Sequence, residues 1–330
     1  MPKESEIISF IRKRARQTDR VLVGIGDDAA VIKSTGASDL VACSDLSLEG
    51  VHFRVEWSDA WLIGRKSLAV TLSDVAAMGA QARFALISVA LPPALSSEFI
   101  DQLFRGFFNI ADSYGVSIIG GDTSGSVHGL FIDTVVIGEA QSGRAVTRAG
   151  ARAGDLIYVS GKLGASALGL SLLEQGCRLN ESDDRAQRDA MVKHLIPEPR
   201  LGAGKAIGEA GIATAMIDIS DGLSTDLWHI LDESHCGAII RAGDIPVAES
   251  VELLSPDRAL QFALHGGEEY ELLFTSPADL KIKVEELSKA LSLPITAIGK
   301  ITEAGGLLLE HDGACDPVEP SGYEHGVGSP

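Results

Sequence analysis

The sequence predicts two domains that each mix helices with strands, an α+β fold class, and three observations support this. Strand-like and helical segments recur along the chain, but they do not alternate strictly enough for one doubly wound sheet. Between residues 141 and 155 the sequence is rich in Gly, Ala and Arg and has no strong periodicity. A chain of 330 residues is long enough for two hydrophobic cores. We therefore expect one domain at 1–141 and another at 150–330.

The first half contains three segments with helical character and six short apolar runs. The last helix has Ser96 as its expected N-cap, ahead of Glu98. The expected helices span 4–16, 58–78 and 96–114, and the expected strands span 21–23, 29–32, 40–43, 84–91, 116–119 and 130–137. We expect the strand at 116–119 to be buried and to deliver Gly120-Gly121-Asp122 at its end.

The second half shows a similar mixture. Two of its helical segments flank the break at Pro197-Glu198-Pro199. Other helices are expected at 165–173, 223–234 and 278–291, and strands at 156–159, 215–219, 238–241, 272–275 and 295–298.

Composition and charge exclude several classes of protein. The formal net charge of −18 leaves no basic surplus for a nucleic-acid partner, although it suits a protein that concentrates divalent cations. No apolar stretch is long enough to span a membrane, and the N-terminus is too charged for a signal peptide. The four cysteines lack metal-site spacing, which indicates reduced thiols in a cytoplasmic protein.

The strongest functional signal is a set of carboxylates beside glycines or serines in separate segments. Each set stands where a strand-like run ends or a helix begins. The sets are Gly24-Ile25-Gly26-Asp27-Asp28, Ser44-Asp45, Ser73-Asp74, Gly120-Gly121-Asp122-Thr123 and Asp218-Ile219-Ser220-Asp221-Gly222. Glycine lets a backbone approach a phosphate, and carboxylates ligate Mg²⁺. Since bare carboxylates repel polyphosphate, the combination predicts a site in which metal ions lie between protein and nucleotide.

Each set also has a simpler interpretation. Gly24–Ala29 is alternatively a turn with solvated acids, and Gly120–Gly125 a hairpin turn. Asp74 has small apolar neighbours, so we expect it to be partly buried beside a metal or an arginine. Asp221 is alternatively the N-cap of the next helix.

Other nucleotide and hydrolase motifs are absent. Residues 24–29 match G-x-G-x-x-A, but two aspartates occupy the loop and a strand-like run follows, which argues against a dinucleotide fold. There is no Walker A loop, no H-E-x-x-H and no G-x-S-x-G. His52 is a lone histidine, and residues of this kind are more often structural than functional.

The ordered set of motifs resembles one family over nearly the whole chain. Gly-Ile-Gly-Asp-Asp-Ala, Val-His-Phe, Leu-Ser-Asp-Val-Ala-Ala-Met-Gly, Ile-Gly-Gly-Asp-Thr, Asp-Ile-Ser-Asp-Gly-Leu and Gly-Gly-Glu-Glu-Tyr-Glu-Leu appear in this order. This series resembles the thiamine-monophosphate kinases, within the aminoimidazole-ribonucleotide-synthetase-like ATP-binding superfamily.

The resemblance implies ATP-dependent phosphorylation of thiamine monophosphate to thiamine diphosphate in the cytoplasm. It implies a homodimer whose N-terminal sheets join into a barrel. It also implies three sets of site residues: Asp28, Cys43 (at most through its carbonyl), Ser44, Asp45, Asp74, Asp122, Asp218 and Asp221 for several Mg²⁺ ions; Tyr114, Gly121, Asp122, Arg148 and Ser220 for ATP; His52, Glu268 and Tyr323 for thiamine monophosphate. Gly326 departs from the family pattern, because an aromatic residue is expected there.

The chemistry agrees with that implication. The acceptor is a phosphate oxygen that is already anionic near neutral pH, so direct in-line transfer assisted by metal needs no catalytic side chain. Two alternatives remain: another ATP-using member of the superfamily, of the aminoimidazole ribonucleotide synthetase or hydrogenase-maturation kind, and a Mg-nucleotide-binding module without turnover.

Overall fold

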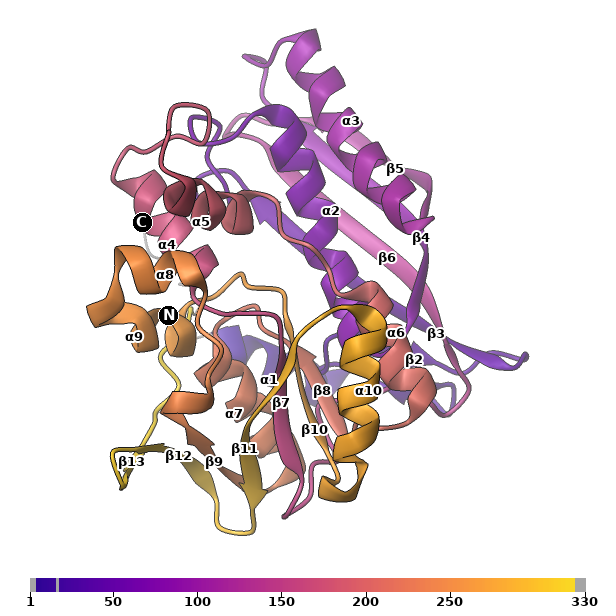
Figure 1. Cartoon of the computed structure of the whole chain (residues 1–330). Helices are drawn as coiled ribbons and strands as arrows, with labels where there is room; N and C mark the ends of the chain where they lie inside the picture. Colours follow the sequence, from indigo (N-terminus) through magenta and orange to yellow (C-terminus); the bar gives the residue numbers. More distant parts are fainter. Residues whose placement is uncertain (1–3, 16–17, 324–330) are drawn as a thin grey trace.

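The computed structural model describes residues 4–15 and 18–323, which form two mixed α/β domains, each built on its own sheet (Figure 1). The first sheet has the order β1-β2-β3-β6-β4-β5. Its strands are β1 (Val21–Val23), β2 (Ala30–Ile32), β3 (Ser38–Leu48), β4 (Gln81–Leu91), β5 (Ser117–Gly125) and β6 (Phe131–Gln141). All neighbours are antiparallel except β4 and β5, which confirms that the chain is not one doubly wound sheet.

Two long helices, α2 (Ala60–Ala77) and α3 (Ser97–Tyr114), pack side by side against this sheet (Figure 1). Their backbones meet at reciprocal glycines. A Cβ at Gly64 would lie 2.0 Å from the Leu103 carbonyl oxygen, and one at Gly106 would lie 2.1 Å from that of Trp61. Ser96 caps α3 as predicted, because its hydroxyl accepts the Phe99 N–H. The shorter α1 (Glu4–Arg14) precedes the sheet.

On the opposite face of the first sheet, several large apolar side chains are exposed among the residues that the structure describes. Side chains alternate along a strand, so Val41 and Ala85 face the helices while their neighbours Leu40 and Phe84 face outward. Leu46 and Ile119 are 54% and 56% exposed. A single copy of the chain therefore leaves large apolar side chains in water on this face.

The strand predicted at 116–119 is longer and more exposed than expected. β5 is an edge strand that runs through Gly120-Gly121-Asp122, so these residues lie inside a strand rather than at its exit. Pairing with β4 keeps the glycines extended, and a Cβ at Gly121 would lie 1.7 Å from the Ile87 oxygen. Ser44-Asp45 likewise lies within β3, not at the end of a shorter strand.

The second sheet has the order β13-β12-β9-β11-β7-β10-β8, again mostly antiparallel. Its strands are β7 (Leu156–Ser160), β8 (Ala215–Asp218), β9 (Gly237–Arg241), β10 (Leu272–Ser276), β11 (Ile295–Thr302), β12 (Gly306–His311) and β13 (Ala314–Pro317). Its α-helices are α4 (Ala165–Glu174), α5 (Arg185–Leu195), α6 (Leu201–Ala210), α7 (Leu223–Ser234), α8 (Glu249–Leu254), α9 (Ala259–His265) and α10 (Lys281–Leu291). The sequence analysis did not predict α8, α9, β12 or β13.

The two domains share a continuous hydrophobic core along α2. Residues from both domains, such as Leu72, Ile207 and Phe274, belong to one buried cluster. Beside this cluster the Arg65 guanidinium donates to the Pro197 carbonyl oxygen at 3.0 Å. Helix α2 is therefore the wall against which the second domain is fixed. Within the described part of the chain, no helix has the length and apolar character needed to cross a membrane.

Candidate functional site

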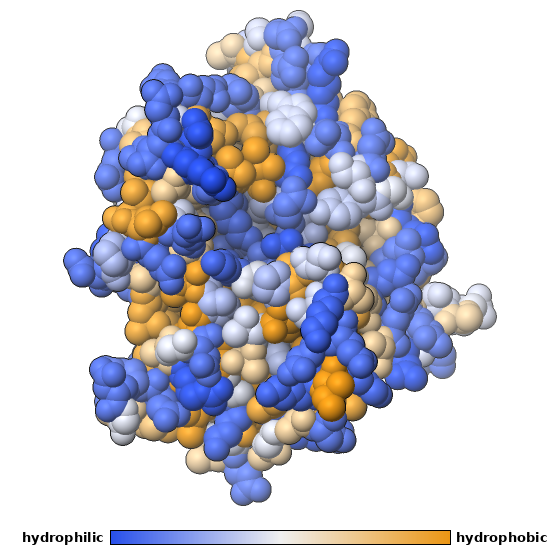
Figure 2. All heavy atoms as spheres, viewed as in Figure 1, coloured by the Kyte–Doolittle hydropathy of each residue, from blue (hydrophilic) through white to orange (hydrophobic). Residues whose placement is uncertain are grey.

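A cavity of about 910 Å³ lies between the two domains, and Figure 2 shows the hollow from one side. Its walls include parts of β3, α2, α4 (Ala165–Glu174) and α5 (Arg185–Leu195), and three further segments of the second domain, at 218–221, 265–270 and 321–323. Most residues that the sequence analysis singled out line it: Asp28, Ser44, Asp45, His52, Asp74, Arg148, Asp218, Ser220, Asp221, Glu268 and Tyr323.

One end of this cavity holds four aspartates, two buried and two half-buried, which we call the acid cluster: Asp28, Asp45, Asp74 and Asp218. One carboxylate oxygen from each of Asp28, Asp74 and Asp218 lies within 4.8 Å of the others. Asp74 comes from α2 and Asp218 from the end of β8, so both domains contribute. Ser73, beside Asp74, donates its hydroxyl to Asp218 at 2.5 Å.

Burial and mutual repulsion make the acid cluster electrostatically unfavourable in the protein alone. Burial, reinforced by Asp28, raises the pKa of Asp218 to about 7. Burial, reinforced by Asp45 and Asp218, raises the pKa of Asp74 well above its usual range. The Oδ2 atoms of Asp28 and Asp45 are buried and lack a hydrogen-bond partner. Unpaired carboxylate oxygens in such a group fit Mg²⁺, which prefers oxygen ligands.

Arg148 is the cation nearest to this cluster, and it joins the two neighbouring aspartates that precede β2. Its guanidinium pairs with Asp28 at 2.5 Å, and its backbone N–H donates to the Asp27 carboxylate at 3.2 Å. Burial and the charge of Asp28 raise the pKa of Asp27 to about 6. Asp27 belongs to the Gly24–Asp28 motif, but no site role was predicted for it from the sequence.

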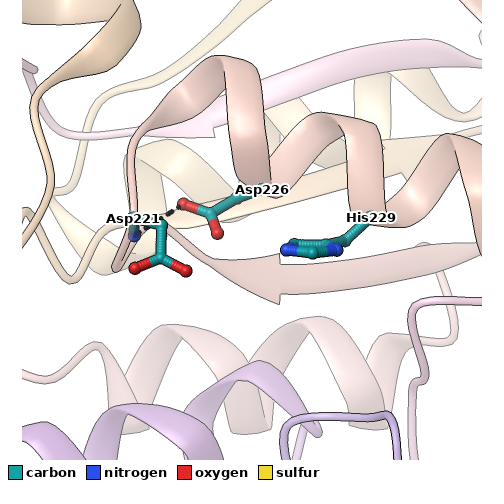
Figure 3. Close-up of side chains that lie close together, drawn as sticks. All are labelled: Asp221, Asp226 and His229. Carbon is teal, nitrogen blue, oxygen red and sulfur yellow. Dashed lines mark hydrogen bonds between the residues drawn. The ribbon is translucent and has the colours of Figure 1, made fainter. Parts of the chain in front are cut away.

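A second group of possible ligands lies at the start of α7: Asp221, Asp226 and His229 (Figure 3). The Asp226 carboxylate turns back and accepts the backbone N–H groups of Asp221 at 3.1 Å and Gly222 at 3.0 Å. Asp226 therefore satisfies the helix start from within the helix, and Asp221 is not its N-cap. Sequence reasoning missed Asp226 and His229, because an acid in the first turn of a helix is ordinary.

The other end of the cavity contains Lys66, His194 and Glu268. Lys66 is 7% exposed, and its amine lies 2.8 Å from a Glu268 carboxylate oxygen and 3.4 Å from His194 Nε2. His52, also in the wall, accepts the Leu48 N–H on its Nδ1 at 3.0 Å. Sequence reasoning missed Lys66 and His194. One signal was available in the sequence. Lys66 lies on the same helix face as Asp74, two turns before it, and is separated from it by the apolar Val70.

Four predicted site residues lie outside the cavity wall. The Cys43 thiol donates to the Thr71 carbonyl oxygen, and the Tyr114 hydroxyl donates to Glu198 at 2.9 Å. Gly121 and Asp122 are exposed on β5, three strands away from Asp45 and thus about 14 Å across the sheet. Gly326 lies outside the described residues.

Comparisons with known proteins extend over almost the whole chain. The models for the N-terminal and C-terminal domains of AIR synthase related proteins match residues 26–140 and 152–312. Thiamine-monophosphate kinase of Bacillus subtilis (strain 168) is 34% identical, over 98% of this chain and 99% of that protein. Its counterpart from Escherichia coli (strain K12) is 36% identical, over 96% and 95%.

Solved structures give the same result. A structure of AaThiL complexed with AMPPCP and TMP is 32% identical, with a TM-score of 0.85 over 98% of this chain and 97% of that one. Thiamine-monophosphate kinase from Stenotrophomonas maltophilia K279a is 38% identical, with a TM-score of 0.79 over 93% and 96%. The hydrogenase maturation protein HypE of E. coli, at 23% identity and a TM-score of 0.66, shows a likeness of fold alone.

Proposed function

The chain belongs to the thiamine-monophosphate kinase family of AIR synthase related proteins, and from this premise we propose how its site works. The protein transfers a phosphoryl group from ATP to thiamine monophosphate and forms thiamine diphosphate. The observation that carries this conclusion is its likeness, at a TM-score of 0.85, to a structure that binds an ATP analogue and TMP together. The interdomain cavity is lined by most of the matching motifs of this chain, those at 27–28, 44–52, 74, 218–221 and 266–270.

The acid cluster, together with Ser44 and Asp221, would hold several Mg²⁺ ions. The unpartnered oxygens of Asp28 and Asp45 support this assignment, and Cys43 would contribute only its carbonyl. When bound, the ions would neutralise the charge of the phosphates that meet there. The carboxylates themselves supply the ligands and hold both domains around one point.

The remaining cavity residues would bind the two substrates. Arg148 and Ser220, beside the acid cluster, would contact ATP, with Tyr114 and Gly121 as further ATP contacts. His52, Glu268 and Tyr323 would contact thiamine monophosphate. We assign no catalytic side chain, because the acceptor oxygen is already anionic. Transfer is direct, in a complex that holds both substrates, and forms no phosphoenzyme.

The chain would act as a homodimer in which the first sheets of two copies form a barrel. Support comes from the exposed apolar side chains of the first sheet, such as Leu46 and Ile119, and from β5, whose outer edge pairs with no strand of the described residues. Since Asp122 lies about 14 Å across the sheet from Asp45 of its own chain, we propose that Gly121 and Asp122 complete the nucleotide site of the second copy.

The cell compartment and the domain limits are also proposals. Cysteines without a disulfide, such as Cys43 and Cys236, suit a reducing cytoplasm. We keep 1–141 and 150–330 as the two domains; the first sheet ends at Gln141 and the second begins at Leu156.

The function is tested by measuring ADP formation with Mg²⁺ and ATP in the presence of thiamine monophosphate, thiamine, an aminoimidazole precursor or buffer alone. We expect thiamine monophosphate alone to stimulate turnover, because the site is built for a phosphorylated acceptor bridged by metal. Equal turnover with thiamine would refute the assignment.

The contribution of Asp122 to a second copy is tested by complementation. Asp45→Asn and Asp122→Asn should each be inactive alone. If Asp122 acts across the dimer, mixed dimers contain one intact site, and subunit exchange should restore about a quarter of wild-type activity. If Asp122 acts within its own chain, both sites of the mixed dimer are damaged and no activity returns.

A further inference from the structure

Lys66 is a buried cation in a cavity whose other end is acidic. It projects from α2 of the first domain, but both of its neighbours, Glu268 and His194, belong to the second domain. The Lys66–Glu268 pair, at 2.8 Å, thus joins the two domains inside the substrate cavity.

The position of Lys66 argues against a role as a phosphate ligand. Lys66 precedes Asp74 by two turns of α2, which is about 12 Å along the helix axis. Its amine is already engaged by Glu268 and lies within reach of His194. Around it the cavity wall contains Leu62, Val70 and Leu195, which suit the organic part of an acceptor rather than its phosphate.

Glu268 is held firmly at both its backbone and its side chain. Its φ of 59° lies in the left-handed region, and its N–H donates to the Ser220 carbonyl oxygen at 2.7 Å. Burial on its own raises the pKa of Glu268, but the adjacent Lys66 ammonium lowers it below its usual value, so the carboxylate stays charged. Its side chain remains 28% exposed toward the cavity.

His194 completes the arrangement as a neutral group. Burial and the nearby Lys66 lower the pKa of His194 to about 4. Its Nδ1 lies 3.2 Å from the Ser166 hydroxyl and 3.3 Å from the second Glu268 oxygen. Lys66 is thus the charged partner that fixes Glu268.

We propose that Lys66 is a positioning residue: through its ion pair across the domain interface, it holds the Glu268 carboxylate against the organic part of thiamine monophosphate. A carboxylate placed there suits the amino group and the positive ring of this acceptor. The inference rests on the proposed function. It means that the affinity for thiamine monophosphate depends on both Lys66 and Glu268, and not on Glu268 alone.

The test compares Lys66→Met, Lys66→Arg, Glu268→Gln and the double variant in steady-state kinetics. Lys66→Met should raise KM for thiamine monophosphate at least about tenfold, leave KM for ATP unchanged, and leave kcat within about threefold. Lys66→Arg should recover part of the loss. In the Glu268→Gln background, Lys66→Met should add little, because its effect passes through Glu268.

Lys193→Met is the matched control, because Lys193 also pairs with a buried glutamate, Glu271, at 2.7 Å, but outside the cavity wall. It should leave both KM values unchanged. If Lys66→Met does not fold, the double variant is used instead, because it buries no unpaired charge. A KM for thiamine monophosphate equal to that of Glu268→Gln then supports the proposal.

Additive effects on KM, or an unchanged KM in Lys66→Met, would overturn the inference while wild-type turnover still upholds the function. If the wild type does not phosphorylate thiamine monophosphate at all, the proposed function fails instead.

Discussion

The acid cluster and the segment 266–271 both bury several carboxylates, but they compensate these charges in different ways. In the acid cluster, Asp28 and Asp45 each keep an oxygen without a partner. In the segment 266–271, Glu268 pairs with Lys66, and Glu271 with Lys193 and Arg200. The first region has one cation, Arg148, among its four carboxylates, whereas the second pairs Glu268 and Glu271 with three cations of the chain.

This difference separates two roles of buried charge. Carboxylates that the protein leaves unpaired are available to bind cations, and they reduce the stability of the protein alone. Carboxylates that the protein pairs fix backbone and side-chain positions instead. Glu269 is intermediate: one oxygen accepts the N–H groups of Gly164 and Ser166, and the other is buried without a partner.

The largest effect is expected from Asp45→Asn in the acid cluster. Turnover should fall at least about a hundredfold, because the variant lacks a carboxylate that we propose as a Mg²⁺ ligand at the transferring phosphoryl group. The rise of Tm on adding Mg²⁺ should shrink as well, while circular dichroism stays near wild type.

Asp39→Asn is the matched control for that variant. Asp39 is buried on the same strand, but it accepts hydrogen bonds from Ser142 and Gly143 away from the cavity. Its turnover should remain normal. Near-normal turnover in Asp45→Asn would mean that Asp45 serves only the fold.

In the segment 266–271, Glu271→Gln is expected to have a smaller effect, which is a loss of stability. Removing this buried charge takes away the carboxylate that the half-buried Lys193 and Arg200 share, so the free energy of unfolding should fall by about 3 kcal/mol. Urea unfolding measures the loss, and exposed Glu310→Gln should show none. A change in KM that, expressed as a free energy, exceeds the change in the free energy of unfolding would contradict a purely structural role for Glu271.

The smallest effect concerns Glu269 and its dependence on pH. Burial raises the pKa of Glu269 to about 7 in the folded protein, above the ordinary 4.5. The folded state therefore binds the proton more tightly, and this contribution to stability is lost as pH rises from about 4.5 to 7. Glu269→Gln does not titrate, so from pH 5 to pH 8 its free energy of unfolding should gain about 2 kcal/mol relative to wild type. Urea unfolding measures this change. If the free energies of unfolding of variant and wild type differ by the same amount at pH 5 and pH 8, the raised pKa of Glu269 is excluded.

The sequence predicted those parts of the fold that local signals determine. Ser96 marks the start of α3, and the break at Pro197-Glu198-Pro199 separates α5 from α6 as expected. The predicted end of β5 at residue 119 was wrong. Two consecutive glycines, Gly120 and Gly121, suggest that a strand stops, and only the pairing with β4 shows that it continues. Local composition does not contain that pairing.

The candidate site divides in the same way. Its aspartates were predicted because they stand beside glycines and serines that mark phosphate and metal sites. Lys66 and His194 were missed, since they are 128 residues apart in sequence and meet only through the packing of the domains. The separation of Asp122 from Asp45 in one chain was not predicted either, because it depends on the order of the strands in the sheet, which the motifs do not contain.

The glycine contact between α2 and α3 determines how this site is able to change. The backbones approach so closely at Gly64 and Gly106 that no Cβ fits at either position, which fixes the spacing of α2 from α3, and α2 carries both Lys66 and Asp74. If the acceptor binds as proposed, with its ring near Lys66 and its phosphate near Asp74, this helix would set the distance between the two, and an acceptor with a longer spacer would not fit. A redesign for longer acceptors has to begin in the loops at Trp57 and Tyr323, which border the cavity without setting that length.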